Sequence, residues 1–255
     1  MKKWQWFILG LLTYLVFLIF YMPAIHVIGF VQEKTNNIVD IENVGGTVFS
    51  GTADSITYDG LRVLNVNWSL SVMPLFYGKV NLDINGGSIR NTNQIYVDSS
   101  LSVSLFNTQN ISIENTQIFV PAKPLFSKIQ LPVVITAAGR FRVDIDSFNY
   151  EQGCQSLKGT GNWLQALVNV NANPVQLGTF DAILSCDTPA FVMQITPDNG
   201  ISLDANITLD PAGTYSALGT FAIPANYPQE IKQGAQFFGE PQGNNAYKLN
   251  VKGKL

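Results

Sequence analysis

The sequence of 255 residues is poor in charged side chains. Charged residues make up only 13% of the chain and hydrophobic residues 46%, with a formal net charge of −3. A disordered chain is therefore disfavoured, because such chains combine high charge with low hydrophobicity. The negative net charge, with no cluster of basic residues beyond Lys2 and Lys3, argues against a surface that binds nucleic acid.

The sequence also contains only one histidine, which argues against catalytic sites that depend on an imidazole. The single histidine, His26, precedes the polar part of the chain, and Ser-His-Asp or Cys-His arrangements need an imidazole beside the nucleophile. The chain lacks a Walker A motif, an H-E-x-x-H motif and a complete G-x-G-x-x-G motif. Asp144 and Asp146 alternate beside Arg140 and Arg142, which is typical of a solvated strand face rather than a catalytic carboxylate pair. We predict no catalytic, cofactor or metal site, and a hydrolase is only a remote alternative.

The first thirty residues contain a long apolar run. Residues 4–22 are interrupted only by Gln5, Gly10 and Thr13, and nineteen helical residues span about 28 Å, close to the thickness of the bilayer hydrocarbon. We predict a transmembrane anchor over 4–22. A cleaved signal peptide is the alternative, which the length and aromatic content of the run disfavour.

The flanks of this run set its expected orientation. Lys2 and Lys3 place residues 1–3 in the cytoplasm by the positive-inside rule, and residues 23–40 form a juxtamembrane connection on the other side. The expected interfacial aromatic residues of the anchor are Trp4, Trp6 and Tyr21.

Beyond the anchor, apolar and polar residues alternate. From Leu64 to Val72 every second residue is apolar and the residues between are Asn or Ser, which is the period of a strand with one buried face. The same alternation recurs around residues 80–84, 101–105, 111–113, 141–145, 168–170, 180–184 and 201–209. Turn residues separate these segments, which predicts short strands in an antiparallel sheet.

The predicted fold is mainly β. One face of the sheet has to be covered, and a closed barrel, a sandwich or a curved sheet lined on its concave side would each do this. No Pro/Ser-rich linker divides residues 31–255, so we predict one β domain over 41–255. The similar phrases at 66–69 and 159–163 suggest that this domain has two halves, about 41–135 and 136–255. One short helix is predicted over 228–238, because Pro228 suits its start and Gly239 its end.

The sequence has only two cysteines, Cys154 and Cys186, and both follow the anchor. A paired count outside the cytoplasm favours a structural disulfide, which would stabilise the fold by roughly 3–4 kcal/mol by closing a loop of about 33 residues. Free buried thiols are the main alternative. A redox or metal role is disfavoured because the spacing is not C-x-x-C and no further ligand cluster accompanies the pair.

The order of the motifs resembles the type II secretion system protein N family, also called general secretion pathway protein N. A basic start and one apolar run are followed by a segment similar to the family's G-T-[VL]-W-S-G-x-A signature, with Phe49 where tryptophan is more frequent. The signature residues are Gly46, Thr47, Val48, Phe49, Ser50 and Gly51. Residues 66–78, which contain Trp68, Pro74 and Gly78, are similar to the family's tryptophan strand and proline turn.

The resemblance implies an accessory inner-membrane subunit of the machine that exports folded proteins across the outer membrane. It implies a bacterial inner-membrane protein with a single span, a cytoplasmic N-terminus and a periplasmic β domain. The layout is also similar to AsmA-like envelope proteins, which have one anchor and a curved, groove-like or half-barrel sheet. Expected partners are the inner membrane and other type II secretion subunits, through the anchor and a sheet edge.

Three aromatic residues are candidate contacts: Trp68, Phe237 and Phe238. For Trp68 a core position is the alternative, and Phe237 and Phe238 either cap one end of the sheet or present an exposed contact. The signature segment is expected mainly as a glycine-bounded strand that packs Phe49 inward, rather than as a binding epitope. A competing hypothesis is a module that carries a lipid or another hydrophobic ligand in an apolar groove.

Overall fold

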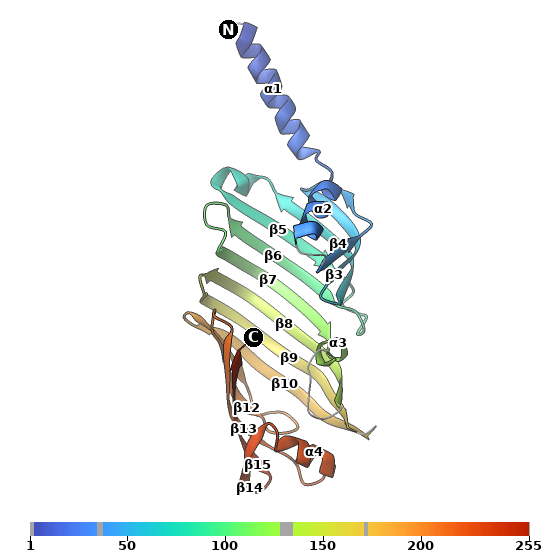
Figure 1. Ribbon diagram of the computed structural model, residues 1–255, viewed down its shortest axis with the longest axis vertical. Helices are drawn as coiled ribbons and strands as arrows, with labels where there is room; N and C mark the ends of the chain where they lie inside the picture. Colours follow the sequence, from blue (N-terminus) through green and yellow to red (C-terminus); the bar gives the residue numbers. More distant parts are fainter. Residues whose placement is uncertain (1–2, 35–37, 128–134, 171–172, 255) are drawn as a thin grey trace.

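The computed structural model describes residues 3–34, 38–127, 135–170 and 173–254, and its fold is mainly β (Figure 1). Fifteen strands form one antiparallel sheet in the order β1-β3-β4-β5-β6-β7-β8-β9-β10-β11-β12-β13-β15-β14, with β2 paired to β3. The strands are β1 (Val39–Glu42), β2 (Gly45–Gly46), β3 (Ser50–Tyr58), β4 (Leu61–Ser71), β5 (Lys79–Gly86), β6 (Tyr96–Ser104), β7 (Asn110–Pro121), β8 (Ile135–Glu151), β9 (Cys154–Val170), β10 (Asn173–Asp187), β11 (Ala190–Ile195), β12 (Asp204–Leu209), β13 (Thr214–Ala222), β14 (Gly239–Gly243) and β15 (Ala246–Lys254). The antiparallel β prediction is confirmed. The sheet is open in the described residues, with β1 and β14 as its outer strands, which corrects the closed-barrel option.

In the part of the chain that the structure describes, four α-helices and one 3-10 helix accompany the sheet. They are α1 (Lys3–Phe20), α2 (Ala24–Lys34), η1 (Met73–Tyr77), α3 (Ala122–Phe126) and α4 (Gln229–Ala235). Helix α1 projects away from the sheet, whereas α2, α3 and α4 lie against it (Figure 1). The predicted short helix near the C-terminus is confirmed as α4, which is shorter than the predicted range 228–238 because Pro228 is its N-cap and Gln236 its C-cap.

Helix α1 occupies most of the segment predicted as a membrane span. Among the residues that the structure describes, no helix has the length and apolar character needed to cross a membrane. This finding does not support the predicted span over 4–22, and α1 ends at Phe20. Trp4, Trp6 and Tyr21 are exposed. Residues 1–2 of the expected cytoplasmic segment lie outside the described residues.

One face of the sheet is apolar along its length, because strand pairing keeps side chains of one parity on the same side. One row of paired residues runs across β4 to β8 through Leu70, Leu82, Leu101, Ile113 and Phe148. A second row crosses β7 to β10 through Val120, Phe141, Trp163 and Phe180, and a third crosses β11 to β15 through Met193, Ile207, Ala217 and Val251.

The opposite face is a ladder of amide and hydroxyl groups. The Ser102 hydroxyl donates to Asn81 Oδ1 at 2.9 Å, and the Ser112 hydroxyl donates to Asn149 Oδ1 at 2.8 Å. Asn149 in turn donates through Nδ2 to Ser156 Oγ at 2.9 Å. These hydrogen bonds join neighbouring strands through uncharged side chains, in keeping with the low charge of the composition.

Bulges explain why the alternation in the sequence is broken into short runs. In β7, Asn115 has a φ of 47°, and the pairing register of β6 and β7 shifts at Asp98/Ser100. The inserted residue lets Ile113 and Thr116, three positions apart, lie on the same face. Gln165 in β9, with a φ of 50°, interrupts the longer alternation in the same way.

The segment 201–203 was expected in a strand over 201–209, but β12 begins only at Asp204. The Asn199 side chain folds this segment into a loop. Its Nδ2 donates to the carbonyl oxygens of Thr196 (2.8 Å) and Leu203 (2.9 Å), and its Oδ1 accepts from the backbone N–H groups of Ile201 (3.3 Å) and Leu203 (2.9 Å). The loop turns Ile201 and Leu203 into the core at the α4 end, where both pack against two clusters of buried residues.

Candidate functional site

The signature segment forms the junction between the N-terminal helices and the sheet. Its four-residue turn closes with the Thr47 N–H donating to the Ser50 carbonyl at 2.8 Å. The Val48 N–H donates to the Met22 carbonyl at 3.1 Å, just beyond α1, and the Leu70 N–H of β4 donates to the Phe49 carbonyl at 2.7 Å. The turn therefore holds the end of α1 on one side and β4 on the other.

The Phe49 ring faces the N-terminal helix. It stacks on Phe20 of α1 with ring centroids 5.0 Å apart and an interplanar angle of 24°. The expectation of an inward-packed Phe49 missed this partner, because nothing in the local alternation shows that a helix from the start of the chain returns to this turn.

Trp68 and Gly51 lock the base of the same turn. The Trp68 indole N–H donates to the Val48 carbonyl at 3.2 Å, and the indole ring lies directly against the backbone of Gly51. A Cβ on Gly51 would overlap that ring and would approach the Gly45 carbonyl oxygen to 2.7 Å. Gly46 has a φ of 84°, which favours glycine. The glycines and the tryptophan of the two motifs thus belong to one packed unit, and Trp68 is half-buried within it.

An apolar cavity of about 280 Å³ lies beneath α2 beside this junction. The cavity is lined by Ala24, Val27 and Ile28 of α2 and, from the turn and the sheet, by Ile41, Val48, Ile56, Val66, Trp68, Leu70, Leu82 and Ile84. No charged or hydrogen-bonding side chain other than the Trp68 indole is among these residues. The cavity has the lining expected of a site for a hydrocarbon group.

Farther along the apolar face, aromatic rings fill the space. Phe126 of α3 stacks on Phe141 and Trp163, and Trp163 also stacks on Phe180, with ring centroids 5.2–6.3 Å apart. Of the residues expected to face inward, Val66 and Leu82 line the cavity whereas Phe141 is covered by α3. The apolar face is therefore hollow near α2 and packed near α3.

Helix α4 covers the C-terminal end of the apolar face. Ile231 packs against the buried cluster of β9 and β10, and the Tyr227 hydroxyl donates to the carbonyl oxygens of Gln176 (2.9 Å) and Gly200 (3.2 Å). Phe237 and Phe238 follow the helix with 64% and 39% of their surfaces exposed. Exposure of Phe237 fits a contact residue better than a cap of the sheet, but its role as a contact stays a prediction.

Tyr227→Phe is expected to make the protein less sensitive to alkaline pH. Burial raises the pKa of Tyr227 above its ordinary value of 10.0. Above pH 10 the Tyr227 hydroxyl loses its proton more readily in the unfolded chain than in the folded chain. The contribution of the protonated hydroxyl to the stability of the fold is therefore complete below pH 10 and is lost as the pH rises through the pKa of the folded state. The variant should lose about 1 kcal/mol at neutral pH with the hydroxyl's hydrogen bond, and should decline less steeply above pH 10. Urea unfolding of both proteins at neutral and alkaline pH measures this; parallel declines would contradict it.

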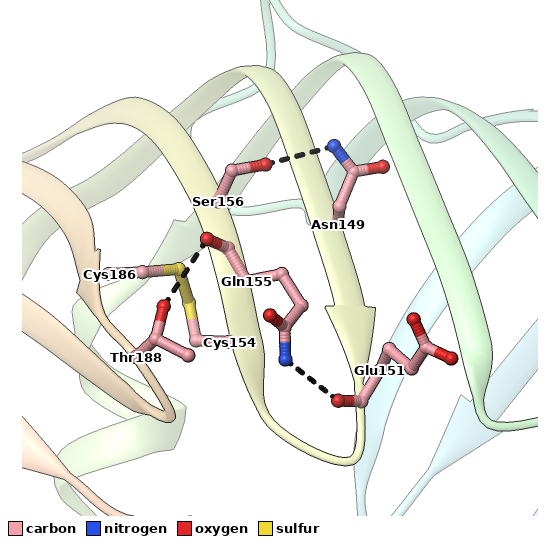
Figure 2. The surroundings of a disulfide bond; sticks show 7 residues. All are labelled: Asn149, Glu151, Cys154, Gln155, Ser156, Cys186 and Thr188. Carbon is pink, nitrogen blue, oxygen red and sulfur yellow. Dashed lines mark hydrogen bonds between the residues drawn. A yellow bond between two sulfur atoms is a disulfide. The ribbon is translucent and has the colours of Figure 1, made fainter.

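The predicted disulfide between Cys154 and Cys186 is present, with 5.6 Å between the two Cα atoms (Figure 2). It links the start of β9 to the end of β10, and Cys154 is fully buried. Hydrogen bonds surround it: Thr188 Oγ1 donates to the Gln155 carbonyl at 3.4 Å, and Gln155 Nε2 donates to the Glu151 carbonyl at 2.9 Å (Figure 2). The bond therefore links the turn between β8 and β9 to the turn between β10 and β11.

The charged strand face of β8 is partly as expected. Arg142 forms an ion pair with Asp144 at 2.6 Å, and Lys158 pairs with Asp146 at 3.1 Å. Arg140 differs: it is buried, its guanidinium lies 4.2 Å from the centre of the Phe119 ring, and it donates to the Ile89 carbonyl at 2.7 Å. Burial lowers the pKa of Arg140. Arg140 thus holds the loop between β5 and β6, a role that its sequence neighbours do not reveal.

In the described ranges no group of three or more His, Cys, Asp or Glu residues is placed to hold a metal ion. The geometry instead contains surfaces for association: the exposed α1, the junction with its apolar cavity, and the exposed aromatic residues after α4.

Known proteins are similar to nearly the whole chain. The profile of the family described as type II secretion system (T2SS), protein N, matches residues 37–250. Proteins named type II secretion system protein N from Vibrio cholerae and Aeromonas hydrophila are 23% and 26% identical, over 85% and 97% of this chain and 85% and 96% of their own lengths. A third, from Pectobacterium carotovorum subsp. carotovorum, is 24% identical over 96% of this chain and 94% of its own. No solved structure matches the chain.

Proposed function

Because the chain belongs to the type II secretion system protein N family, we propose that it acts as a tethered periplasmic scaffold at the inner membrane during export of folded proteins. Membership makes it a type II secretion component of the cell envelope. The scaffold role is the finer step, and the observation that carries it is the junction in which residues 46–51 bind both the end of α1 and strand β4.

The N-terminal helix supports attachment to the membrane. Helix α1 projects from the sheet (Figure 1). Its exposed apolar and aromatic side chains include Trp4, Phe7 and Tyr14. In this proposal α1 attaches the chain to the inner membrane, and the single-pass orientation with a cytoplasmic N-terminus stays a prediction. The junction fixes the sheet to the end of this helix, so that a partner bound to the sheet is held at the membrane.

The outer strands are less suited to partner binding than the exposed side chains. Strand β14 contains Pro241, which lacks a backbone N–H, and Gln32 of α2 donates to the Ile41 carbonyl of β1 at 3.5 Å. Both features limit the addition of a further strand. We therefore place contacts with other secretion subunits first on α1 and on Phe237, and only second on a sheet edge.

Photo-crosslinking in living cells tests the scaffold. A photoreactive amino acid at Trp6 or at Phe237 is expected to crosslink to other subunits of the secretion system, because both side chains are exposed. The matched control is the same amino acid at Asn206, an exposed residue of β12 on the polar face. Crosslinks identified by mass spectrometry from positions 6 and 237, but weaker from 206, are the expected result. Equal labelling at all three positions, or capture of no secretion subunit, would contradict the proposal.

A second candidate function, a lipid carrier with an AsmA-like groove, is favoured by the apolar cavity beneath α2. The cavity is large enough for part of an acyl chain, and its lining carries no charge. Lipid that co-purifies in a fixed ratio and is lost when Val66 is replaced by Trp would favour the carrier. Crosslinks to secretion subunits without such lipid would favour the scaffold.

A further inference from the structure

We propose that two neighbouring loops form a second contact with the membrane, at the surface of an anionic phospholipid bilayer. The loops are η1 and the turn between β6 and β7, and we call their exposed apolar side chains the aromatic tip. The aromatic tip consists of Met73, Phe76, Tyr77, Leu105 and Phe106. This inference rests on the proposed attachment of α1 to the membrane and adds a site on the β domain itself.

Four of the five members of the aromatic tip, all but Leu105, are the most exposed large apolar side chains of the described residues. Phe106 has 90% of its surface exposed, Tyr77 has 81% and Phe76 has 80%. Scattered single apolar residues are common on protein surfaces, but a contiguous exposed group of large side chains marks a site of association.

The two loops are held together as one unit. The Leu105 N–H donates to the Gly78 carbonyl at 2.8 Å, and the Phe106 ring lies directly over Gly78. Gly78 also ends η1, because its N–H donates to the Leu75 carbonyl at 3.0 Å. The aromatic tip is therefore built before it meets a partner, and little conformational entropy is lost on binding.

The aromatic tip lies at the same end of the sheet as the base of α1. Strand β4 leads directly into η1, and Leu70 near the end of this strand donates to Phe49, which stacks on Phe20 of α1. In Figure 1 the short cyan helix after β4 accordingly lies at the end of the sheet from which α1 rises. A bilayer that receives α1 is thus within reach of the tip.

The chemistry of the tip selects lipid as the occupant. Residues 72–79 and 104–110 contain no Asp or Glu, and Lys79 is their one charged residue, although the whole chain carries a net charge of −3. The two loops therefore supply one lysine and no carboxylate of their own, which suits negatively charged headgroups; the carboxylate beside them is that of Glu151, which accepts from Asn107 Nδ2 at 3.4 Å. Tyrosine is one of the residue types that are enriched at membrane interfaces, and phenylalanine and leucine are typical of an apolar surface buried at the boundary of headgroups and acyl chains.

Fluorescence quenching in vesicles tests the aromatic tip. Both native cysteines are in the disulfide, so a cysteine introduced by Phe106→Cys or Tyr77→Cys can be labelled alone with an environment-sensitive dye. The labelled full chain is reconstituted into vesicles of phosphatidylethanolamine and phosphatidylglycerol that carry a lipid-linked quencher. Asn206→Cys, on the polar face, is the matched control.

Dye at 106 and at 77 is expected to shift to shorter wavelength and to lose at least about half of its emission to the quencher, while dye at 206 is unaffected. Dye at 106 and 77 that is quenched no more than dye at 206, on a chain that floats with the vesicles, would overturn the tip contact and leave the α1 attachment intact. A chain that fails to float would overturn both. A tip that serves only a protein partner would give the unquenched result.

Discussion

Loss of the Cys154–Cys186 disulfide is expected to lower the free energy of unfolding by roughly 3–4 kcal/mol. The two cysteines are separated by 32 residues, and the bond restricts the corresponding loop in the unfolded chain. In the folded chain the bond joins β9 to β10, and β9 is paired over nearly its whole length with β8 and from Gly159 to Val170 with β10. A loss of this size is a large fraction of the stability of an ordinary domain.

The measurement is denaturant unfolding of the purified chain with and without a reducing agent. The double variant Cys154→Ser/Cys186→Ser has no bond to reduce. It should therefore unfold at the same denaturant concentration with and without the reducing agent, and this concentration should be lower than that of the oxidised native chain. It is the control for effects of the reducing agent on other parts of the chain. An unchanged midpoint for the reduced native chain would contradict the stabilising role of the bond.

Gly51→Ala is expected to destabilise the junction by about 1–3 kcal/mol. The added methyl group would overlap the Trp68 ring and press on the Gly45 carbonyl, and the backbone at Gly45 cannot yield without breaking the pairing of β2 with β3. The Trp68 indole would then move away from the Val48 carbonyl, and the turn that holds α1 would loosen.

Gly161→Ala is the matched control for this variant. Gly161 also lies in a strand, but the nearest atoms to its added Cβ are side-chain carbons of Leu184 and Ala182 at 3.8–4.0 Å, an ordinary contact. It should be neutral or slightly stabilising, by up to about 1 kcal/mol, because alanine restricts the unfolded chain. Thermal or chemical unfolding measures both variants. Equal stability of the two would show that the junction is not tightly packed.

The sequence contained the architecture of the sheet because the alternation of apolar and polar residues directly reflects which face each side chain occupies. Most strand positions from Leu64 onward, the β class and the helix near residue 230 follow from local patterns of this kind, whereas the disulfide was predicted from the paired number of cysteines and the expected compartment. The family could also be predicted, because each short motif and the order of the motifs can be recognised in the sequence without knowledge of the fold.

Apart from the disulfide, features that depend on contacts between distant segments could not be predicted. Nothing near Phe49 indicates that its ring meets Phe20, and nothing near Arg140 indicates that it holds a loop some fifty positions away. The loop at Asn199 replaced an expected strand because one amide side chain satisfies four hydrogen bonds, which outweighs the apolar alternation of residues 201–203. The bulges at Asn115 and Gln165 likewise interrupt the alternation of apolar and polar residues in β7 and β9, and no residue type near them marks their positions in the sequence.

The openness of the sheet and the apolar cavity are properties of the assembled fold. Alternation shows that one face needs a cover, but it does not show whether the cover is a second sheet, the sheet itself or separate helices. In this chain α2, α3 and α4 each cover a part of the apolar face of the sheet, and the apolar cavity lies beneath α2.

Protein export by a strain that lacks this chain tests the central claim most directly. The quantity to measure is the fraction of a substrate of the type II secretion system that reaches the medium. The native chain and Gly161→Ala should restore export, whereas Gly51→Ala, present at an equal level, should leave more of the substrate in the periplasm because the sheet is no longer fixed to α1. Undiminished export from the strain without the chain would contradict its proposed role in secretion, and full export with Gly51→Ala would contradict the importance of the junction.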